Sequence, residues 1–346
     1  MAERKEESRR IQLTGKSTYI VSLPKWWASE MKLKPGDIIN MIVQDDSLLL
    51  TVRKSAVEHE REREATLKVL PDENPDKIIR KIVSLYLVGY NTIRIISEKE
   101  RISNLQSELI KNFVRTKLIG TEVIMDLPTE IVVKVILSYP ELSIRDAVRR
   151  MTLITKSMIE DSIEALNKKD HELARSVIVR DDDVDRFSMY IIRQLKSAVG
   201  DRRIMRDVGI ESARDCLGYR LIVKSVERIA DHASTISKNV IKLRGAIDHS
   251  VVEKLSEMKD LVVRAFEKTI ESLFKEDPEL SEEVIGMKEL VVKSENQIDE
   301  MIMKKPARTD AIVISLIVES LRRMYEYSCD IAEVVLNLTL EKQQAV

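Results

Sequence analysis

The chain from residue 140 onward contains an internal repeat. When the sequence is shifted by 107 positions, Met151–Ile178 aligns with Met258–Ile285, and with a shift of 95 positions Leu221–Ile236 aligns with Leu316–Ile331. Repeats of this length exceed the roughly 20 to 50 residues of a solenoid unit. The repeat therefore predicts two copies of one compact domain, and it constrains the fold of most of the chain.

Each copy is predicted to be a three-helix bundle. Proline interrupts helices, and after Pro140 it occurs only at Pro278 and Pro306, where we expect helices to begin. The third helix of each copy repeats small or apolar residues in alternating steps of four and three, which is the spacing of bundle packing. These positions are Ile222, Val226, Ile229, Ala233, Ile236, Val240 and Leu243 in the first copy, and Ile317, Leu321, Met324, Ser328, Ile331, Val335 and Leu338 in the second. We expect the bundles at residues 140–246 and 247–346.

The N-terminal region has a different pattern. After a charged tail at residues 1–8, residues 9–54 alternate short apolar bursts with turn signals, which predicts four short strands and a short helix from Lys25 to Met31. A unit of fewer than about 50 residues has a marginal core of its own. We therefore expect this unit to pair with a second copy in a homodimer.

A charged stretch and a small α/β domain are expected next. Residues 55–65 are almost all charged and are interpreted as a linker. Residues 66–137 have neither a glycine-rich loop nor clustered titratable groups, which is typical of a scaffold. The expected strands are Leu67–Leu70, Thr92–Ser97, Thr121–Asp126 and Ile131–Leu137, and the expected helices are Pro75–Val88 and Glu98–Lys117. The fold class is therefore mainly α, with two small strand-containing domains in front.

The composition excludes several classes of protein. The chain of 346 residues has a net charge of −1 and two cysteines 113 positions apart. We therefore expect neither a disulfide framework nor a cysteine zinc site, and we expect the protein to be cytoplasmic. No apolar run reaches the roughly 20 residues of a membrane span. Gly15-Lys16-Ser17 lacks the earlier glycine of a phosphate-binding loop, and no catalytic triad is evident. We do not expect an enzyme.

Two acidic pairs are the candidate metal ligands. Glu227 and Asp231 fall outside the apolar positions of their helix, one turn apart, and Asp181 and Asp185 have the same spacing one helix earlier. Two such pairs on adjacent helices form an oxygen-rich patch that suits hard cations or carboxylate-bridged iron. The alternative is a solvated acidic face. His232 could join a metal site, although a local hydrogen bond at the rim explains it better.

The second copy has a weaker version of this patch. Glu295 and Asp299 correspond to the first pair, but Arg322 replaces Glu227 and Glu326 replaces Asp231. Arginine is not a metal ligand, and it neutralises neighbouring carboxylates. We therefore expect the second patch to bind metal weakly or not at all.

The N-terminal unit carries the opposite charge. Between Ser8 and Lys34 there are six basic residues and one acidic residue, a net charge of +5 that dimerisation would double. Such a density favours contacts with the phosphate backbone of DNA. Ordinary surface lysines are the alternative.

The helical repeat resembles the PhoU family, whose members carry tandem three-helix bundles with (E/D)xxxD motifs. The third helix of that family often has a sequence similar to ERIGDHA, and residues 227–233 here are ERIADHA. The resemblance implies that Asp181, Asp185, Glu227 and Asp231 bind metal ions, iron first, with zinc, magnesium or manganese as alternatives. It implies a second site at Glu295 and Asp299, which Arg322 puts in doubt.

The N-terminal unit resembles SpoVT/AbrB-type domains, which are swapped-hairpin homodimers that bind DNA. The matching segment ends in SLPKWWASEMKLKPGD, although Trp26 and Trp27 depart from the polar residues usual there. The resemblance implies that Arg9, Arg10, Lys16 and Lys25 face DNA. The combination of domains is similar to archaeal phosphate uptake regulators, which implies a negative regulator acting at the promoter of phosphate-uptake genes.

Two alternatives stay open. In the first, the N-terminal unit only dimerises, and the bundles dock on the phosphate ABC transporter ATPase or a sensor kinase as an adaptor. In the second, the carboxylates form a metal enzyme, although such sites usually point into the bundle and include Glu-x-x-His pairs, which this sequence lacks.

Overall fold

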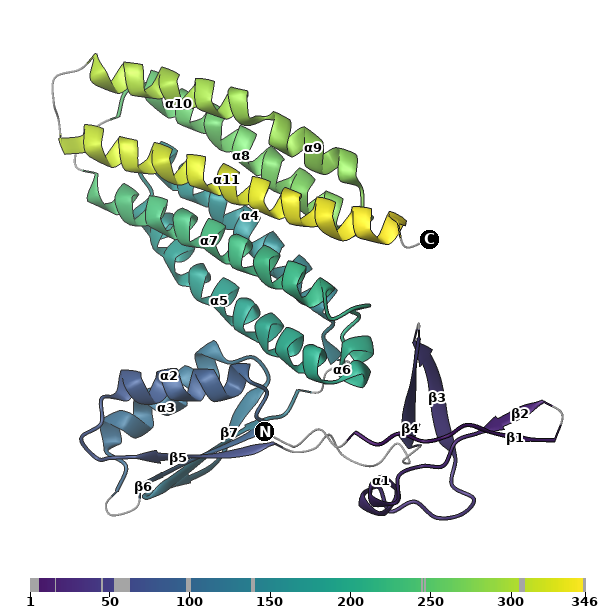
Figure 1. Cartoon of the computed structure of the whole chain (residues 1–346). Coiled ribbons are helices and arrows are strands. Elements are labelled where there is room, and N and C mark those ends of the chain that lie inside the picture. Colours follow the sequence, from purple (N-terminus) through teal and green to yellow (C-terminus); the bar gives the residue numbers. More distant parts are fainter. Residues whose placement is uncertain are drawn as a thin grey trace. The chain divides into compact units, whose positions relative to one another are not determined.

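The computed structural model divides the chain into two compact units, residues 1–61 and 62–346 (Figure 1). It describes residues 6–15, 17–44, 46–52, 63–97, 101–137, 141–243, 245, 247–304 and 309–344. Each unit is described by itself below.

The N-terminal unit consists of two separate β-hairpins and a short helix. Strands β1 (Gln12–Thr14) and β2 (Thr18–Ile20) pair antiparallel, as do β3 (Ile39–Gln44) and β4 (Ser47–Val52), with α1 (Lys25–Glu30) between the hairpins. These elements confirm the sequence prediction. None of the described residues in this unit is buried, and Tyr19 and Val43 are each 76% exposed. The described residues of a single copy therefore form no apolar core.

The second unit begins with the small α/β domain. Its mixed sheet has the order β5-β6-β8-β7, in which only β5 and β6 are parallel. Apolar residues of α2 and α3, such as Ile78, Ile82 and Ile110, pack on the Ile95 and Val133 face of the sheet. The elements are β5 (Glu64–Val69), α2 (Pro75–Leu87), β6 (Thr92–Ser97), α3 (Asn104–Lys117), β7 (Thr121–Leu127) and β8 (Glu130–Val135).

The predicted starts of β5 and α3 are wrong, and they are the largest differences from the expected boundaries in this domain. Strand β5 begins at Glu64, inside the expected linker, because its backbone pairs with β6 from Thr92 onward. Helix α3 begins at Asn104 instead of Glu98, because Ser103 forms a reciprocal capping box with Gln106 that fixes the start of the helix. Residues 53–62 and 98–100 lie outside the described residues.

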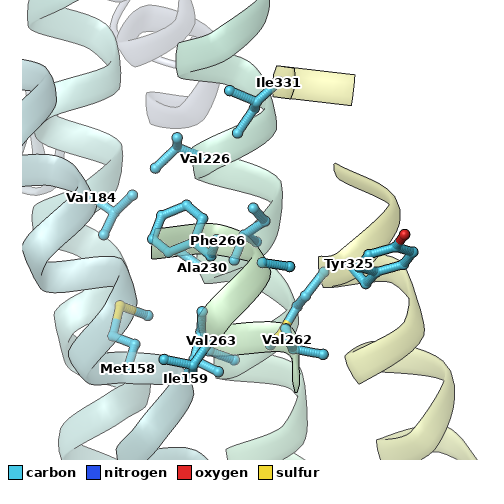
Figure 2. Close-up of a cluster of buried hydrophobic side chains, with 14 of the residues drawn as sticks. Met158, Ile159, Val184, Val226, Ala230, Val262, Val263, Phe266, Tyr325 and Ile331 are labelled. Atoms are coloured by element: carbon cyan, nitrogen blue, oxygen red, sulfur yellow. The ribbon is translucent and has the colours of Figure 1, made fainter. Parts of the chain in front are cut away.

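The remainder of the unit is the predicted tandem of helical bundles. The first contains α4 (Ile144–Lys168), α5 (His171–Gly200) and α7 (Asp215–Lys242). The second contains α8 (His249–Lys275), α9 (Pro278–Gly286), α10 (Lys288–Met303) and α11 (Thr309–Gln344). The predicted apolar positions of α7 and α11 are buried, except that Leu243 and Leu338 are only partly buried. Figure 2 shows that both bundles contribute to one core, with Val184 and Val226 near Phe266 and Ile331.

The repeated residues include those that end one helix and begin the next. Lys169 and Glu276, which are aligned in the two copies, both adopt left-handed backbone conformations with φ of 53° and 54°. The following Asp170 and Asp277 are both N-caps, and the side chain of each accepts a hydrogen bond from the backbone two residues on, at 3.0 Å. The repeat therefore preserves a turn as well as a core.

Two features of the bundles differ from the prediction. The connection between α5 and α7 contains an additional short helix, α6 (Arg202–Asp207). The second helix of the second copy is broken at Met287 into α9 and α10, whereas α5 is continuous. The hydroxyl of Tyr325 donates to the carbonyl oxygens of Val284 (3.0 Å) and Ile285 (3.2 Å), which satisfies backbone groups freed by the break. Pro278 is the first residue of α9, as expected, and Pro306 lies outside the described residues.

The α/β domain is fixed to α5 by a buried arginine. Arg193 is only 3% exposed, and its guanidinium donates to the carbonyl oxygens of Tyr86 (2.5 Å) and Tyr90 (2.8 Å) at the end of α2. Gly89 ends the same helix with a φ of +94°, and a Cβ atom there would lie 3.0 Å from the Ser197 hydroxyl of α5. The α2 terminus therefore packs closely on α5.

Gly89→Ala tests this contact. We expect a loss of roughly 1 to 3 kcal/mol in unfolding free energy, because alanine is strained at positive φ and its methyl group would push on α5. Gly286→Ala is the control, since its φ is not positive and a Cβ atom there would meet no described neighbour within 4 Å. Urea unfolding of the full chain measures both variants, and equal stabilities would contradict the contact.

Candidate functional site

The four predicted carboxylates of the first bundle lie close together. Asp181 and Asp185 are on α5, and Glu227 and Asp231 are on α7, the helix packed beside it (Figure 1). We call these four residues the first acidic cluster. All four are partly or fully accessible at the surface, outside the apolar positions of their helices. The heptad spacing of α7 placed Glu227 and Asp231 outside the core, and both are accessible at the surface.

Burial and mutual repulsion raise the pKa values of three carboxyl groups in the cluster. Burial, followed by the charges of Glu227, Asp181 and Asp231, raises the pKa of Asp185 to about 6. Burial also raises the pKa of Asp181 and of Asp231, and neighbouring carboxylates contribute in each case. Lys238 on α7 acts in the opposite direction on the pKa values of Asp181 and Asp231. The cluster therefore holds more negative charge than its surroundings neutralise.

Glu227 is held in place by two donors that the sequence did not indicate. The buried Ser188 of α5 donates its hydroxyl to Oε2 at 2.7 Å, and Lys224 contacts Oε1 from one turn earlier on α7. The buried Ser234 hydroxyl lies near Asp181 but makes no hydrogen bond of normal geometry. Ser188 and Lys224 therefore orient the Glu227 carboxylate, and the Ser234 hydroxyl is an additional oxygen beside Asp181.

The chemistry of the cluster fits a hard cation. Its donors are carboxylate and hydroxyl oxygens, and a divalent ion would relieve their repulsion. Within the described ranges, no three His, Cys, Asp or Glu side chains are gathered around one point. The ligand type and charge therefore fit a metal ion, while the oxygens are spread over the surface of α5 and α7.

His232 faces the second bundle. Its ring lies 5.8 Å from the ring of Tyr327 on α11, tilted by 34°, and its Nδ1 atom is buried without a hydrogen-bond partner among the described residues. Burial lowers the pKa of His232, which favours the neutral ring. Because a shift of 95 positions aligns these two residues, the contact joins equivalent positions of the two copies.

The equivalent region of the second bundle is built around an arginine. Arg322 on α11 forms ion pairs with Glu295 of α10 (3.3 Å), with Glu319 (2.6 Å) and with Glu326. In the first copy Lys224 pairs with Glu227, and at the aligned positions of the second copy Glu319 pairs with Arg322. The acidic and basic residues of this ion pair are therefore exchanged between the copies. The guanidinium therefore stands where the first copy has a carboxylate. Asp299 also lies on α10, and it adds a negative charge near Glu295.

The predicted DNA-contacting residues are only partly described. Arg10 and Lys25 are exposed, and Arg9 is exposed and pairs with Glu7 at 2.5 Å. Lys16 lies outside the described residues.

Two segments, residues 148–240 and 255–335, match the PhoU domain family, and together they make up half of the chain. The chain belongs to the PhoU family. Residues 12–58 match a second family, described as antidote-toxin recognition MazE, bacterial antitoxin, which agrees with the predicted AbrB-like unit. The PhoU family consists of regulatory accessory proteins, so membership confirms the prediction that the chain is not an enzyme.

Curated relatives share the name phosphate-specific transport system accessory protein PhoU homolog. The Clostridium acetobutylicum protein is 28% identical over 113 residues, which cover 33% of this chain and 50% of that protein. The Aquifex aeolicus protein is 25% identical over 164 residues, 46% of this chain and 70% of that protein. The match to the Borreliella burgdorferi protein is 32% identical and spans 46% of its length. The chain therefore matches about half the length of two of these relatives.

Two solved structures share the fold. PhoU from Pseudomonas aeruginosa superposes with a TM-score of 0.51 at 20% identity, covering 57% of this chain and 96% of that structure. The phosphate transport system regulatory protein PhoU from Streptococcus pneumoniae gives a TM-score of 0.50 at 17% identity, covering 56% and 92%. These similarities confirm the predicted, mainly helical fold class. No helix in the described part of the chain is long and apolar enough to cross a membrane.

Asp185→Asn tests the repulsion within the first acidic cluster. The folded-state pKa of about 6 exceeds the ordinary 3.8, so stability falls as the pH rises above 3.8, and the loss is complete above about pH 6. We expect the variant without metal to gain roughly 1 to 2 kcal/mol at pH 7, and much less at about pH 4.5, where the wild-type group is protonated in the fold. Asp183→Asn, which removes a 3.4 Å pair with Arg186, is the control and should give no gain. Thermal unfolding at both pH values decides, and an equal gain at both would contradict the assignment.

Proposed function

We propose that the protein is an accessory regulator of phosphate transport that represses phosphate uptake from the cytoplasm. The observation that carries this proposal is the PhoU tandem of bundles with the first acidic cluster in register with the family motif. The names of the curated relatives support the role in phosphate transport. The negative direction of control follows from the family resemblance, and the cytoplasmic location follows from the two widely separated cysteines.

The first acidic cluster is proposed to bind metal ions, iron first, with zinc, magnesium or manganese as alternatives. The bound ion would supply positive charge among carboxylates that repel one another. Asp181, Asp185 and Asp231 would hold it, together with Glu227, which Ser188 keeps in position. Glu295 and Asp299 form the weaker second candidate, because Arg322 already pairs with Glu295.

Isothermal titration with Mn²⁺ under reducing conditions tests this assignment. We expect binding to the wild-type chain at pH 7.5, and a loss of at least about tenfold in affinity in Glu227→Gln, because a neutral amide is a poorer ligand than a carboxylate. Arg322→Glu should add a second set of binding sites, because it removes the guanidinium and restores the first-copy pattern. Glu271→Gln on α8, far in sequence from both clusters and paired with Lys275, is the control. Wild-type binding that is unchanged in Glu227→Gln would contradict the site.

The N-terminal unit is proposed to form a homodimer. Its described residues include no buried side chain, while apolar side chains on both hairpins are exposed. Burying such surface contributes about 25 cal/mol per Å², which is the only large stabilising term open to so small a unit. A second copy of the same unit offers the matching apolar surface. The exposed members are Ile11, Leu13, Tyr19, Ile20, Ile38, Met41, Val43 and Leu48.

The dimeric unit is proposed to bind DNA at promoters of phosphate-uptake genes. Arg9, Arg10 and Lys25 are exposed, and two copies would double their charge on one small surface. Lys16 belongs to the proposed set from the sequence alone. The adaptor hypothesis is the second candidate, in which the unit only dimerises and the bundles dock on the transporter ATPase or a sensor kinase. It is favoured by Trp26, a large apolar side chain that is 38% exposed beside Lys25.

Fluorescence anisotropy separates these two candidates. We expect the full chain to bind a promoter duplex more tightly than random DNA, with affinity that falls steeply as salt is raised. Arg9→Ala with Arg10→Ala should weaken binding by about tenfold or more, because phosphate contacts are lost. Arg202→Ala with Arg203→Ala, an exposed pair on α6, is the matched control. Absence of binding by a chain shown to be dimeric would favour the adaptor.

A further inference from the structure

The α/β domain places a cation at the rim of the first acidic cluster. Lys117 is the last residue of α3, and its ammonium group forms an ion pair with Asp182 of α5. Asp182 is adjacent in sequence to Asp181 and one turn of α5 away from Asp185. The positive charge of Lys117 also lowers the pKa of both Asp181 and Asp185. A residue from outside the bundle therefore shields two of the four carboxylates.

Lys117 belongs to a domain that is anchored elsewhere on the same helix. The guanidinium of Arg193 is buried against the end of α2, 11 positions along α5 from Asp182, or about three helical turns. Arg193 holds backbone carbonyls and is itself buried, whereas the Lys117–Asp182 pair has side chains that are 24% and 56% exposed. The Arg193 contact is therefore the stronger of the two, and the partly exposed Lys117–Asp182 pair is weak enough to open.

A divalent cation and Lys117 would compete for the same negative charge. A divalent ion held by Asp181 and Asp185 would repel the Lys117 ammonium group, which is paired with the adjacent Asp182. The ion carries twice the charge of the ammonium group. Lys117 cannot diffuse away, because Arg193 keeps its domain on α5. The consequence of metal loading would therefore be a movement of the C-terminal end of α3 away from the cluster.

We propose that Lys117 is a tethered counter-cation of the first acidic cluster, displaced when the cluster binds metal, so that the α/β domain responds to metal occupancy. This inference rests on the proposed metal binding. It gives the α/β domain a regulatory role, in place of the scaffold expected from its sequence. The carrier of the signal is the segment that follows Lys117 and leads into β7, which packs with α3.

Mn²⁺ titration of full-length variants tests the competition. Lys117→Met should bind Mn²⁺ about three- to tenfold more tightly than the wild type at low salt, because one competing charge is gone. Lys117→Arg keeps the charge and should retain the wild-type affinity. Lys111→Met is the matched control, since Lys111 is on the same helix but pairs with Asp126 inside the α/β domain at 2.7 Å.

Hydrogen exchange gives a readout that does not depend on affinity. Mn²⁺ should accelerate exchange in the last turn of α3 and the start of β7 in the wild type, and Lys117→Met should show fast exchange there before metal is added. Clear Mn²⁺ binding with equal affinity in wild type and Lys117→Met, or no change in exchange on loading, would overturn the inference and leave the metal proposal standing. No binding by any variant would overturn both.

Discussion

The packing of α7 against α11 is the contact on which the tandem of bundles depends. The two helices run in opposite directions (Figure 1), and the start of α7 lies against the end of α11, where a Cβ atom on Gly218 would be 2.9 Å from Leu338. Near the middle, the rings of the aligned residues His232 and Tyr327 meet. Because each third helix buries its repeated apolar positions, both bundles share one core. The core of each copy is therefore completed by residues of the other.

The same helical geometry places the carboxylates outside the core, and the two copies treat them differently. In the first copy burial, followed by the charges of the neighbouring carboxylates, raises the pKa of Asp185. In the second copy Arg322 satisfies Glu295, Glu319 and Glu326 together, which makes that region an internal ion-pair network. Unrelieved repulsion lowers stability, and the proposed metal ion would relieve it in the first copy. The divergence of the repeat separates a candidate binding copy from a structural one.

Local patterns predicted most of the fold, and long-range contacts account for what they missed. The repeat, the heptad spacing and the turn residues predicted the bundles, the hairpins and the position of the first acidic cluster. The contact of Tyr325 at the break beside Met287 was missed because Tyr325 is distant in sequence and occupies a position that is Ala230 in the first copy. Ser188, Lys117 and Arg193 were missed for the same reason, since each is polar or charged in an ordinary helical sequence and acquires its role only through a partner on another element.

The helical bundles and the N-terminal unit bury apolar surface in different ways. The bundles form a core from an internal duplication, so the second copy of the domain is supplied by the same chain. The N-terminal unit is not duplicated, and the proposed homodimer would bury the apolar side chains that its hairpins expose. Dimerisation there would bring two complete tandems to one site, each with its first acidic cluster and its α/β domain. The N-terminal units would then hold the two chains together, while the bundles of both chains would respond to metal. Ligand response and dimerisation could therefore vary independently.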